Sequence, residues 1–260
     1  LGPGETREAR FGGQAGAEIV IAGRNLEKIK AAAAKLEQHG GPVIPVQTDM
    51  ASMDDIRALV DRTVDEFGKI DFLFNNAGIT VGAEVRDMVL DHFRFVVDTN
   101  LWGVAYGSLY AYEVMLKQGC GHIINTASMA GLLPFPSQTA YVATKFGVVG
   151  FSKSLRLEAA AFGVNVSIVC PGFVRTGIFE ASQLIKVDKQ KLLAALPPKM
   201  MPPKQAAQII LKGVHKNKAV IVFPFVARIF WWLYRLHPVL LAPIHRKMVI
   251  DFRRLRMSSE

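Results

Sequence analysis

A tyrosine and a lysine, Tyr141 and Lys145, stand four residues apart in a stretch whose apolar periodicity predicts a helix. At this spacing both side chains lie on one face of the helix. A free phenol has a pKa of about 10, and a nearby ammonium group lowers that pKa because it favours the phenolate. The pair is therefore suited to general acid–base chemistry, although ordinary helix surfaces show the same spacing.

Three segments of small and polar residues stand just past predicted strands and add context to this pair. They are Asn75-Asn76-Ala77-Gly78, the segment Asn125–Gly131 around Ser128, and Pro171-Gly172 with Thr176 shortly after it. The carboxyl ends of parallel strands meet at the edge of a sheet where such folds bind ligands. We therefore expect the Ser128 hydroxyl to reach the same crevice as Tyr141. Small residues there let a ligand approach the backbone.

The elements that position these residues alternate between short apolar runs and longer amphipathic runs. Strands are predicted at Glu18–Ala22, Val43–Gln47, Phe72–Phe74, His122–Asn125, Asn165–Val169 and Val220–Phe223. Helices are predicted at Leu26–Gln38, Met53–Phe67, Asp87–Leu116, Ala140–Phe162 and Lys204–His215. The alternation is typical of an α/β fold with a parallel sheet flanked by helices. The proline-rich residues 178–203 interrupt it and indicate either a lid over a pocket or a solvated loop.

Composition and charge limit the classes of protein to consider. Half of the 260 residues are hydrophobic, which excludes intrinsic disorder. Residues 1–203 hold 20 basic and 20 acidic side chains and residues 204–260 hold 11 and 2, so the net charge of +9 lies in the C-terminal part. A neutral body with a basic tail favours a docking element. The two cysteines and six histidines predict neither disulfides nor a metal site, and no signal peptide or membrane-spanning run is visible, so we expect a cytoplasmic protein.

Taken together, these motifs resemble the short-chain dehydrogenases/reductases over roughly residues 17–223. The match also includes Asn100, within Asn100-Leu101-Trp102-Gly103. The resemblance implies a single Rossmann-type domain, residues 1–223, whose doubly wound parallel sheet binds a nicotinamide cofactor. Residues 224–260 form a basic, aromatic C-terminal extension beyond the shared family core.

The resemblance also implies a role for each matching residue. Tyr141 would exchange the proton with the carbonyl or alcohol oxygen, to which Ser128 would hydrogen-bond. Lys145 would hold the nicotinamide ribose and lower the tyrosine pKa, and Asn100 would anchor a water in the proton relay. The remaining cofactor contacts would come from Asn76, Ala77, Gly78, Pro171, Gly172 and Thr176, with Asp49 beside the adenine.

The end of the first predicted strand bears on the choice of cofactor. An acidic residue at this position would bind the ribose 2′-hydroxyl and repel a 2′-phosphate. Gly23 removes that repulsion and Arg24 offers donors suited to a phosphate, so we expect NADP(H) rather than NAD(H). The alternative is that Arg24 stacks on the adenine and selects neither cofactor.

The first 15 residues depart from the family pattern. A dinucleotide-binding sheet opens with a strand and a glycine-rich turn whose backbone N–H groups contact the pyrophosphate. This chain opens with Leu1-Gly2-Pro3-Gly4 and shows no strand before it. Two hypotheses follow. The chain is a truncated or altered form of an enzyme that naturally carries the missing strand, or it is a non-catalytic binding or scaffold protein.

The sequence indicates the chemical class of the substrate and the helix that forms the subunit contact. Apolar residues near the catalytic segments are expected to line a pocket for a hydrophobic ketone, aldehyde, alcohol or lipid: Met129, Leu132, Leu133, Pro134, Phe135, Phe173, Ile178, Phe179 and Leu184. The helix Ala140–Phe162 carries Ala143, Gly147, Gly150 and Phe151, which allow close helix approach. The resemblance implies a homodimer or homotetramer built on this helix.

The tail Phe225–Met257 combines Trp, Tyr and Phe with Arg and Lys. Such residues settle at the boundary between lipid headgroups and acyl chains, while the prolines and arginines argue against a spanning helix. We expect this segment to lie on an anionic membrane near the pocket mouth. The alternatives are packing on the body or on a neighbouring subunit. Nucleic acid is disfavoured because no base-reading module accompanies the charge.

Overall fold

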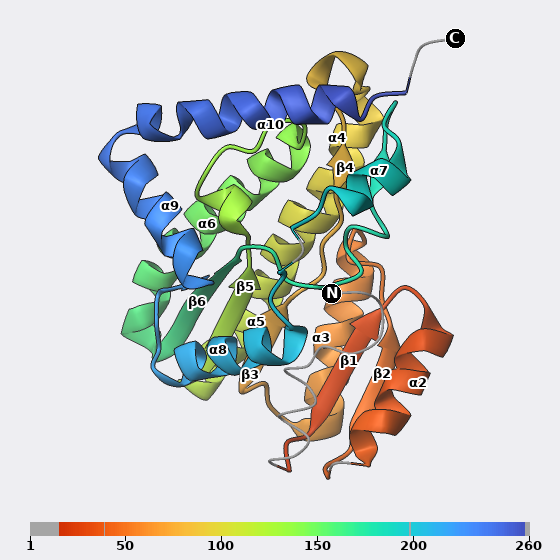
Figure 1. Ribbon diagram of the computed structural model, residues 1–260. Coiled ribbons are helices and arrows are strands. Elements are labelled where there is room, and N and C mark those ends of the chain that lie inside the picture. Colours follow the sequence, from red (N-terminus) through yellow and green to blue (C-terminus); the bar gives the residue numbers. More distant parts are fainter. Residues whose placement is uncertain (1–15, 39, 198, 258–260) are drawn as a thin grey trace.

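Four short runs rich in Val, Ile and Phe form the central sheet of the computed structural model, which describes residues 16–38, 40–197 and 199–257. Such side chains favour strands because they pack well on a pleated surface. The strands are β3 (Phe72–Asn75), β5 (Gly121–Thr126), β6 (Val164–Pro171) and β8 (Val220–Phe223). They are hydrogen-bonded in the order β3–β5–β6–β8, and every pairing is parallel. Their carboxyl ends therefore lie at one edge of the sheet (Figure 1).

Two short parallel ladders accompany the central sheet. β1 (Ile19–Gly23) pairs with β2 (Val43–Gln47), and β4 (Val81–Gly82) pairs with β7 (Gln183–Leu184). Within the described ranges no ladder of hydrogen bonds joins β1 or β2 to the central sheet. The β1–β2 pair lies beyond the β3 end of the central sheet (Figure 1).

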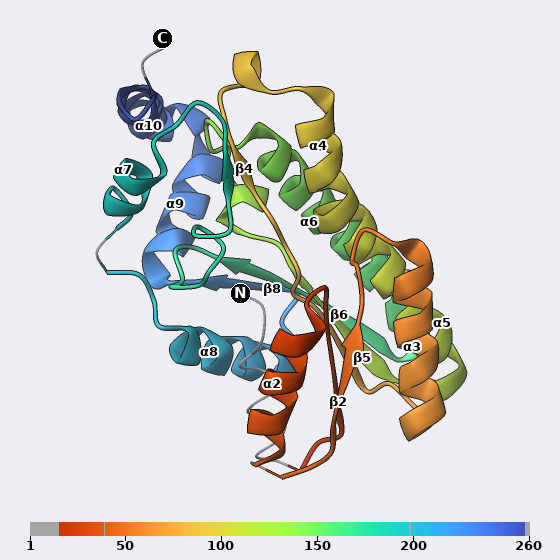
Figure 2. The same ribbon diagram turned by 90° about the vertical axis from the view of Figure 1, so that its right-hand side faces the viewer.

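Helices cover both faces of the sheet (Figure 2). One face carries α3 (Met53–Phe67), α4 (Leu90–Val97), α5 (Gly103–Gln118) and α6 (Thr139–Ala159). The other carries α2 (Leu26–Glu37) and α8 (Pro203–His215). The short α7 (Lys189–Ala194) lies between β7 and α8. The last described elements are α9 (Phe225–Leu236), a 3₁₀ turn η5 (Pro238–Leu241) and α10 (Ala242–Arg254).

The predicted α/β fold and its six strands are confirmed, but the single helix predicted over Asp87–Leu116 is wrong. The structure divides this stretch into a 3₁₀ turn η1 (Val85–Asp87), α4, a π-helical turn η2 (Asp98–Trp102) and α5. The apolar period continues through η2, so the sequence pattern does not reveal the break. The break accompanies a tertiary contact, because Asn100 within η2 is hydrogen-bonded to the backbone of Ile79.

The C-terminal extension packs on the body of the fold. Phe230, Trp231 and Tyr234 of α9 contact the core cluster that α6, β6 and β8 form. At the far end, the Met257 N–H donates to the Lys186 carbonyl at 3.1 Å, which ties the chain beside β7. Across the described part of the chain, no helix combines the length and apolar character needed to cross a bilayer.

Candidate active site

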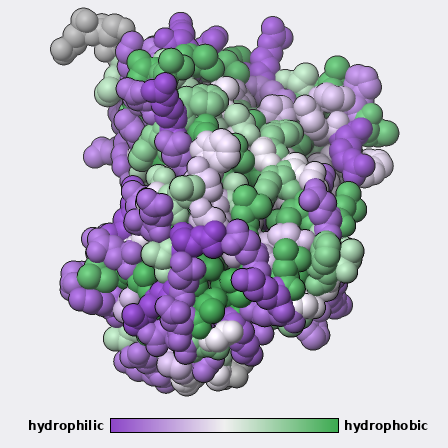
Figure 3. Space-filling model, turned by 180° about the vertical axis from the view of Figure 1, so that it is seen from behind, coloured by the Kyte–Doolittle hydropathy of each residue, from purple (hydrophilic) through white to green (hydrophobic). Residues whose placement is uncertain are grey.

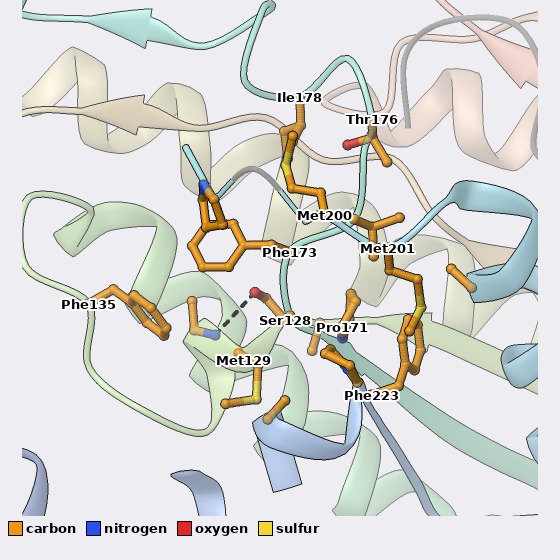
Figure 4. Close-up of a pocket in the computed structure, with 18 of the residues that line it drawn as sticks. Ser128, Met129, Phe135, Pro171, Phe173, Thr176, Ile178, Met200, Met201 and Phe223 are labelled. Carbon is orange, nitrogen blue, oxygen red and sulfur yellow. Dashed lines mark hydrogen bonds between the residues drawn. The ribbon is translucent and has the colours of Figure 1, made fainter. Parts of the chain in front are cut away.

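The end of β5 places Ser128 at the ligand edge of the sheet. Ser128 caps a single 3₁₀ turn, η3 (Met129–Gly131), by accepting a hydrogen bond from the Ala130 N–H at 3.1 Å. Figure 4 draws this bond as a dashed line and shows the Ser128 hydroxyl among the side chains of a cavity. The bond uses only a lone pair of the oxygen, so the hydroxyl proton remains able to donate.

The start of α6 carries Tyr141 and Lys145 beside Ser128. Lys145 is 2% exposed, and its Nζ donates to the Thr126 carbonyl at 2.8 Å. The same nitrogen lies 5.5 Å from the centre of the Tyr141 ring, so the four-residue spacing does bring the two side chains together. Close packing of α6 on η3 requires a glycine at 131, where a Cβ would lie 2.5 Å from the Lys145 carbonyl oxygen.

Burial controls the proton affinities of this pair. It raises the pKa of Tyr141 above its ordinary value, and a hydrogen bond with the Ser128 hydroxyl opposes the rise. Burial also lowers the pKa of Lys145 to about 8. In this structure the loss of hydration, rather than the neighbouring Lys145, dominates the pKa of Tyr141. At neutral pH Tyr141 holds its proton and is a hydrogen-bond donor.

Asn100 lies behind the pair and is fully buried. Its Oδ1 accepts from the Ile79 N–H at 2.9 Å and its Nδ2 donates to the Ile79 carbonyl at 2.8 Å. A Cβ at Gly78 would lie 3.5 Å from Asn100 Oδ1 and 3.6 Å from Lys145 Nζ. Gly78 therefore marks the point where Asn100 and Lys145 approach each other. Asn100 itself does not line the cavity.

Asn76 leaves a donor for a ligand at the end of β3. Its Oδ1 accepts a hydrogen bond from the Thr126 hydroxyl, while its Nδ2 is buried and has no partner among the described residues. Buried amide N–H groups without a partner are rare in proteins. Asn76 and Gly78 line the cavity, whereas Ala77 between them does not.

The end of β6 forms the opposite wall. The Gly172 N–H donates to the Phe223 carbonyl at 2.7 Å, which holds the loop after Pro171 against β8. Pro171, Gly172 and Thr176 all line the cavity, together with the Ser128 and Tyr141 hydroxyls and Lys145. The structure thus brings eight of the twelve predicted site residues to one cavity: Asn76, Gly78, Ser128, Tyr141, Lys145, Pro171, Gly172 and Thr176.

Arg24 and Asp49 lie apart from that cavity, at the carboxyl end of the β1–β2 pair. Both side chains are exposed. The Arg24 carbonyl accepts a hydrogen bond from Gln47 Nε2 at 3.1 Å, and Asp49 Oδ1 accepts one from the Ala51 N–H at 3.0 Å. The expected loss of a strand and glycine-rich turn in the first 15 residues lies outside the described residues.

The cavity has a volume of about 980 Å³, which is at the upper end for small-molecule sites. Six of the nine apolar residues expected to line it do so: Met129, Leu133, Phe135, Phe173, Ile178 and Phe179. Leu132, Pro134 and Leu184 do not, and Leu132 packs into the core instead. The segment 178–203 also contributes Met200 and Met201 to the cavity lining.

Sequence reasoning missed the cavity wall that the C-terminal extension supplies. Val226, Ala227 and Phe230 of α9 line the cavity, and so do Leu241 of η5 and three residues of α10, Ile244, His245 and Met248. The signal was present in the spacing of residues 241, 244, 245 and 248, which share one helix face. The sequence places the extension only near the pocket mouth, because nothing in the local pattern shows that it folds back as a wall.

The chemistry of these donors fits a nicotinamide cofactor. Asn76 Nδ2 has no partner among the described residues, and the Lys145 ammonium uses one of its three N–H groups in the hydrogen bond to Thr126. Both can therefore donate hydrogen bonds to ribose hydroxyl and carboxamide oxygens. Gly78 and Gly172 leave backbone exposed at the strand ends, where dinucleotides bind in such folds. Within the described ranges no group of His, Cys, Asp and Glu is arranged to hold a metal ion.

Comparison with known proteins places this geometry in a family. Residues 9–184 match the family model described as short chain dehydrogenase. A 3-oxoacyl-[acyl-carrier-protein] reductase from Synechocystis sp. is 41% identical over 150 residues, which cover 58% of this chain and only 61% of that reductase. An uncharacterized oxidoreductase from Staphylococcus aureus is 32% identical over 213 residues, 82% of this chain and 87% of the relative.

Solved structures agree with these sequence matches. A short-chain dehydrogenase/reductase from Burkholderia phymatum, in complex with NAD, superposes with a TM-score of 0.78 at 27% identity, covering 97% of this chain and 92% of that one. A short-chain dehydrogenase from Sphingobium yanoikuyae, in complex with NADPH, shares the fold with a TM-score of 0.75 at 22% identity, covering 97% and 93%. The chain belongs to the short-chain dehydrogenase/reductase family of oxidoreductases.

Proposed function

We propose that this chain is an NADP(H)-dependent oxidoreductase that interconverts a hydrophobic ketone or aldehyde and its alcohol. One observation carries the proposal. The hydroxyls of Ser128 and Tyr141 lie together on the wall of a large, mostly apolar cavity, with the Lys145 amine 5.5 Å from the tyrosine ring. Two hydroxyls that converge in an apolar cavity are suited to bind a single carbonyl oxygen and to protonate it.

Each residue of the site has a step that its position supports. Ser128 and Tyr141 donate hydrogen bonds to the substrate oxygen and orient its carbonyl carbon. Tyr141 transfers its proton to that oxygen in reduction and takes it back in oxidation, and its raised pKa keeps the proton in place at neutral pH. Lys145 holds the ribose and resupplies the proton to Tyr141. Asn100 and the Lys145 amine both lie close to Gly78. The bound nicotinamide supplies or accepts the hydride.

The preference for NADP(H) over NAD(H) is supported by Arg24. No carboxylate occupies the strand end at Gly23 to repel a 2′-phosphate, and the exposed Arg24 guanidinium can donate two parallel hydrogen bonds to one. Asp49, just past the end of the neighbouring strand β2, would contact the adenine.

A hydrophobic substrate is supported by the cavity lining. Aromatic and methionine side chains line the cavity, including Met129, Phe173 and Met201, which Figure 4 shows together with Ser128. Methionine adapts to irregular apolar ligands because it is unbranched and flexible. The name of the Synechocystis reductase, which acts on 3-oxoacyl groups, favours a carbonyl on an acyl-like chain.

The contact between subunits is proposed to lie on the α5–α6 side of the molecule, where a homodimer or homotetramer would form. Phe146 and Leu157 on α6 are 42% and 80% exposed, and Trp102 and Leu109 beside them are 48% and 45% exposed. Figure 3 shows this side, where hydrophobic residues gather over the middle of the surface.

Both cysteines are free thiols, which is consistent with the proposed cytoplasmic location.

The test is NADPH oxidation against a panel of apolar carbonyl compounds of increasing chain length, with NADH in parallel. Turnover is expected with NADPH, and Tyr141→Phe should reduce kcat by about 10²-fold or more because it removes the proton donor. Cofactor affinity, measured by NADPH fluorescence, should be retained in Tyr141→Phe. NADPH binding without turnover of any compound would favour the non-catalytic alternative, and wild-type kcat in Tyr141→Phe would refute the assignment.

A further inference from the structure

Helix α9 presents apolar side chains on two opposite sides. Its inner side packs on the core. On its outer side, four large residues repeat at intervals of four, three and four positions and are strongly exposed: Phe225 at 72%, Ile229 at 41%, Trp232 at 63% and Leu236 at 64%. A helix that is apolar all round is normally buried all round. The outer side of α9 has no such cover from the described residues.

The same exposed side continues over η5 and α10. Val239 and Leu240 are 64% and 49% exposed, and Ile250 is 45% exposed. A shallow hollow there mixes apolar and charged residues: Val239, Ala242, Pro243, Arg246, Lys247, Ile250, Asp251 and Arg254. We call the exposed residues of α9, η5 and α10 named in these two paragraphs the extension surface. It lies at the outside of the fold, where α9 and α10 form an angle (Figure 1).

The extension surface is positively charged. Among the residues that define it, Arg246, Lys247 and Arg254 are cationic and Asp251 is acidic. Arg246 makes no ion pair with a described residue, whereas Lys247 and Arg254 share Asp251 at 2.9 and 3.6 Å. Apolar side chains and excess cations are thus interleaved on one surface.

The far end of α10 is fastened to the body by other cations. Arg253 Nε donates to Glu84 Oε1 at 2.8 Å, and Arg256 donates to Glu84 and to Asp87. Together with the packing of α9 on the core, these bonds hold the extension surface as a rigid part of the molecule. Its partner must therefore fit a preformed surface.

Two partners match an exposed apolar surface of this kind, a second copy of the chain and a lipid bilayer. A twofold contact places the same patch of both subunits face to face, so the cations of one copy would meet those of the other and repel them. An anionic bilayer offers acyl chains to Trp232 and Phe225 and negative headgroups to Arg246 and Lys247. We propose that the extension surface docks the protein on an anionic lipid bilayer.

The helices would lie along the bilayer surface. α9 has 12 residues and α10 has 13. At about 1.5 Å per residue each is roughly 20 Å long, short of the roughly 30 Å hydrocarbon core. Their exposed apolar residues would enter only the boundary between headgroups and acyl chains, as in other interfacial helices.

Docking would bring the cavity to the lipid. Val226 and Ile244 line the cavity and are also 50% and 43% exposed, so they form part of its rim beside the extension surface. A hydrophobic substrate dissolved in the bilayer would then reach Ser128 and Tyr141 without crossing water. This second step rests on the proposed function, whereas the docking itself does not.

The first test is co-sedimentation of the full chain with vesicles of phosphatidylcholine alone or with about 30% phosphatidylglycerol. Binding is expected only to the anionic vesicles, and it should weaken with salt. Arg246→Gln with Lys247→Gln should lower the partition coefficient at least about tenfold, since each cation near such a surface contributes about fivefold. The matched control, Arg62→Gln with Lys69→Gln on the body, should leave binding unchanged.

The second test locates the contact with brominated lipids, which quench tryptophan fluorescence in the acyl region. Quenching should largely disappear in Trp232→Phe and persist in Trp102→Phe, since Trp102 lies on the α5–α6 side. Failure of the wild-type chain to bind anionic vesicles, or quenching that depends on Trp102, would overturn the proposal. So would a change of oligomeric state in Trp232→Glu without any loss of vesicle binding, because the surface would then be a subunit contact.

A kinetic comparison separates docking from substrate entry. With a carbonyl substrate dissolved in anionic vesicles, the Arg246→Gln/Lys247→Gln chain should turn over more slowly, while a water-soluble substrate should be reduced at the wild-type rate. If the variant turned over both substrates at the wild-type rate, the proposed entry of substrate from the bilayer would be overturned. A chain that binds vesicles but reduces neither substrate would refute the proposed function and leave the docking result intact.

Discussion

Replacement of Lys145 by methionine should stabilise the cofactor-free chain while it removes activity. Lys145 is 2% exposed, and among the described residues its amine has one hydrogen-bond partner, the Thr126 carbonyl. Such burial disfavours its charged form and lowers its pKa from 10.5 to about 8. At pH 7 the group still carries its proton, so the folded chain holds a poorly solvated charge.

The size of the effect follows from these pKa values. A shift of this size corresponds to about 3 kcal/mol of lost stability at pH 7, because each pKa unit is worth about 1.4 kcal/mol. Methionine has a similar shape and no charge to desolvate. Loss of the hydrogen bond to Thr126 subtracts about 1 kcal/mol, which leaves an expected gain of about 2 kcal/mol at pH 7.

The gain should shrink as the pH rises. Between pH 8 and 10.5 the unfolded chain still binds the lysine proton and the folded chain has released it. The stability of the wild-type chain therefore rises with pH over this window. At about pH 9.5 the penalty has fallen to about 1.4 kcal/mol, so the advantage of Lys145→Met should be close to zero.

The assay is urea unfolding of both chains at neutral pH and near pH 9.5, followed by tryptophan fluorescence. Lys153→Met on the same helix is the control, because Lys153 is exposed and its replacement should change stability by less than about 0.5 kcal/mol. A Lys145→Met chain that is less stable than wild type at pH 7, or whose stability difference does not vary with pH, would refute the reasoning.

Three further predictions follow from the structure. Arg24→Asp should shift the kcat/KM ratio from NADPH towards NADH by about 10- to 100-fold, because a carboxylate repels the 2′-phosphate; an unchanged ratio would show that Arg24 does not read the phosphate. Gly131→Ala should destabilise the chain by about 2 kcal/mol or more, since the new Cβ would lie 2.5 Å from the Lys145 carbonyl oxygen; an unchanged urea midpoint would contradict this packing. Leu157→Glu should convert the proposed dimer to a monomer in light scattering, because Leu157 is 80% exposed in the single subunit and a charge there would be buried in the contact. An unchanged mass would place the contact elsewhere.

The strands and the candidate site around Ser128, Tyr141 and Lys145 were accessible from the sequence because their signals are local. Strand-forming runs and the four-residue spacing of Tyr141 and Lys145 can be read in windows of a few residues. The position of Ser128 just past β5 follows from the rule that ligands bind at the carboxyl ends of parallel strands. These features therefore survive in the structure with shifts of one or two residues at the element ends.

The features that the sequence did not reveal depend on contacts between distant segments. The π turn at Asn100 rests on hydrogen bonds to Ile79, and the raised pKa of Tyr141 depends on burial. The wall formed by α9 and α10 depends on how the extension folds back, which the ion pairs of Arg256 with Glu84 and Asp87 help to hold. In each of these contacts the two partners are too far apart in the sequence to lie in one short window of residues.

The proposed function requires that Tyr141 and Ser128 support hydride transfer between NADPH and a carbonyl carbon in the apolar cavity. The most direct measurement uses NADPH deuterated at the transferring position of nicotinamide C4, with the product alcohol analysed by mass spectrometry. We expect deuterium at the carbinol carbon with the wild-type chain and its loss with Tyr141→Phe, which still binds NADPH. Deuterium transfer at an equal rate by Tyr141→Phe, or none by a wild-type chain that binds both NADPH and the carbonyl compound, would contradict the proposed function.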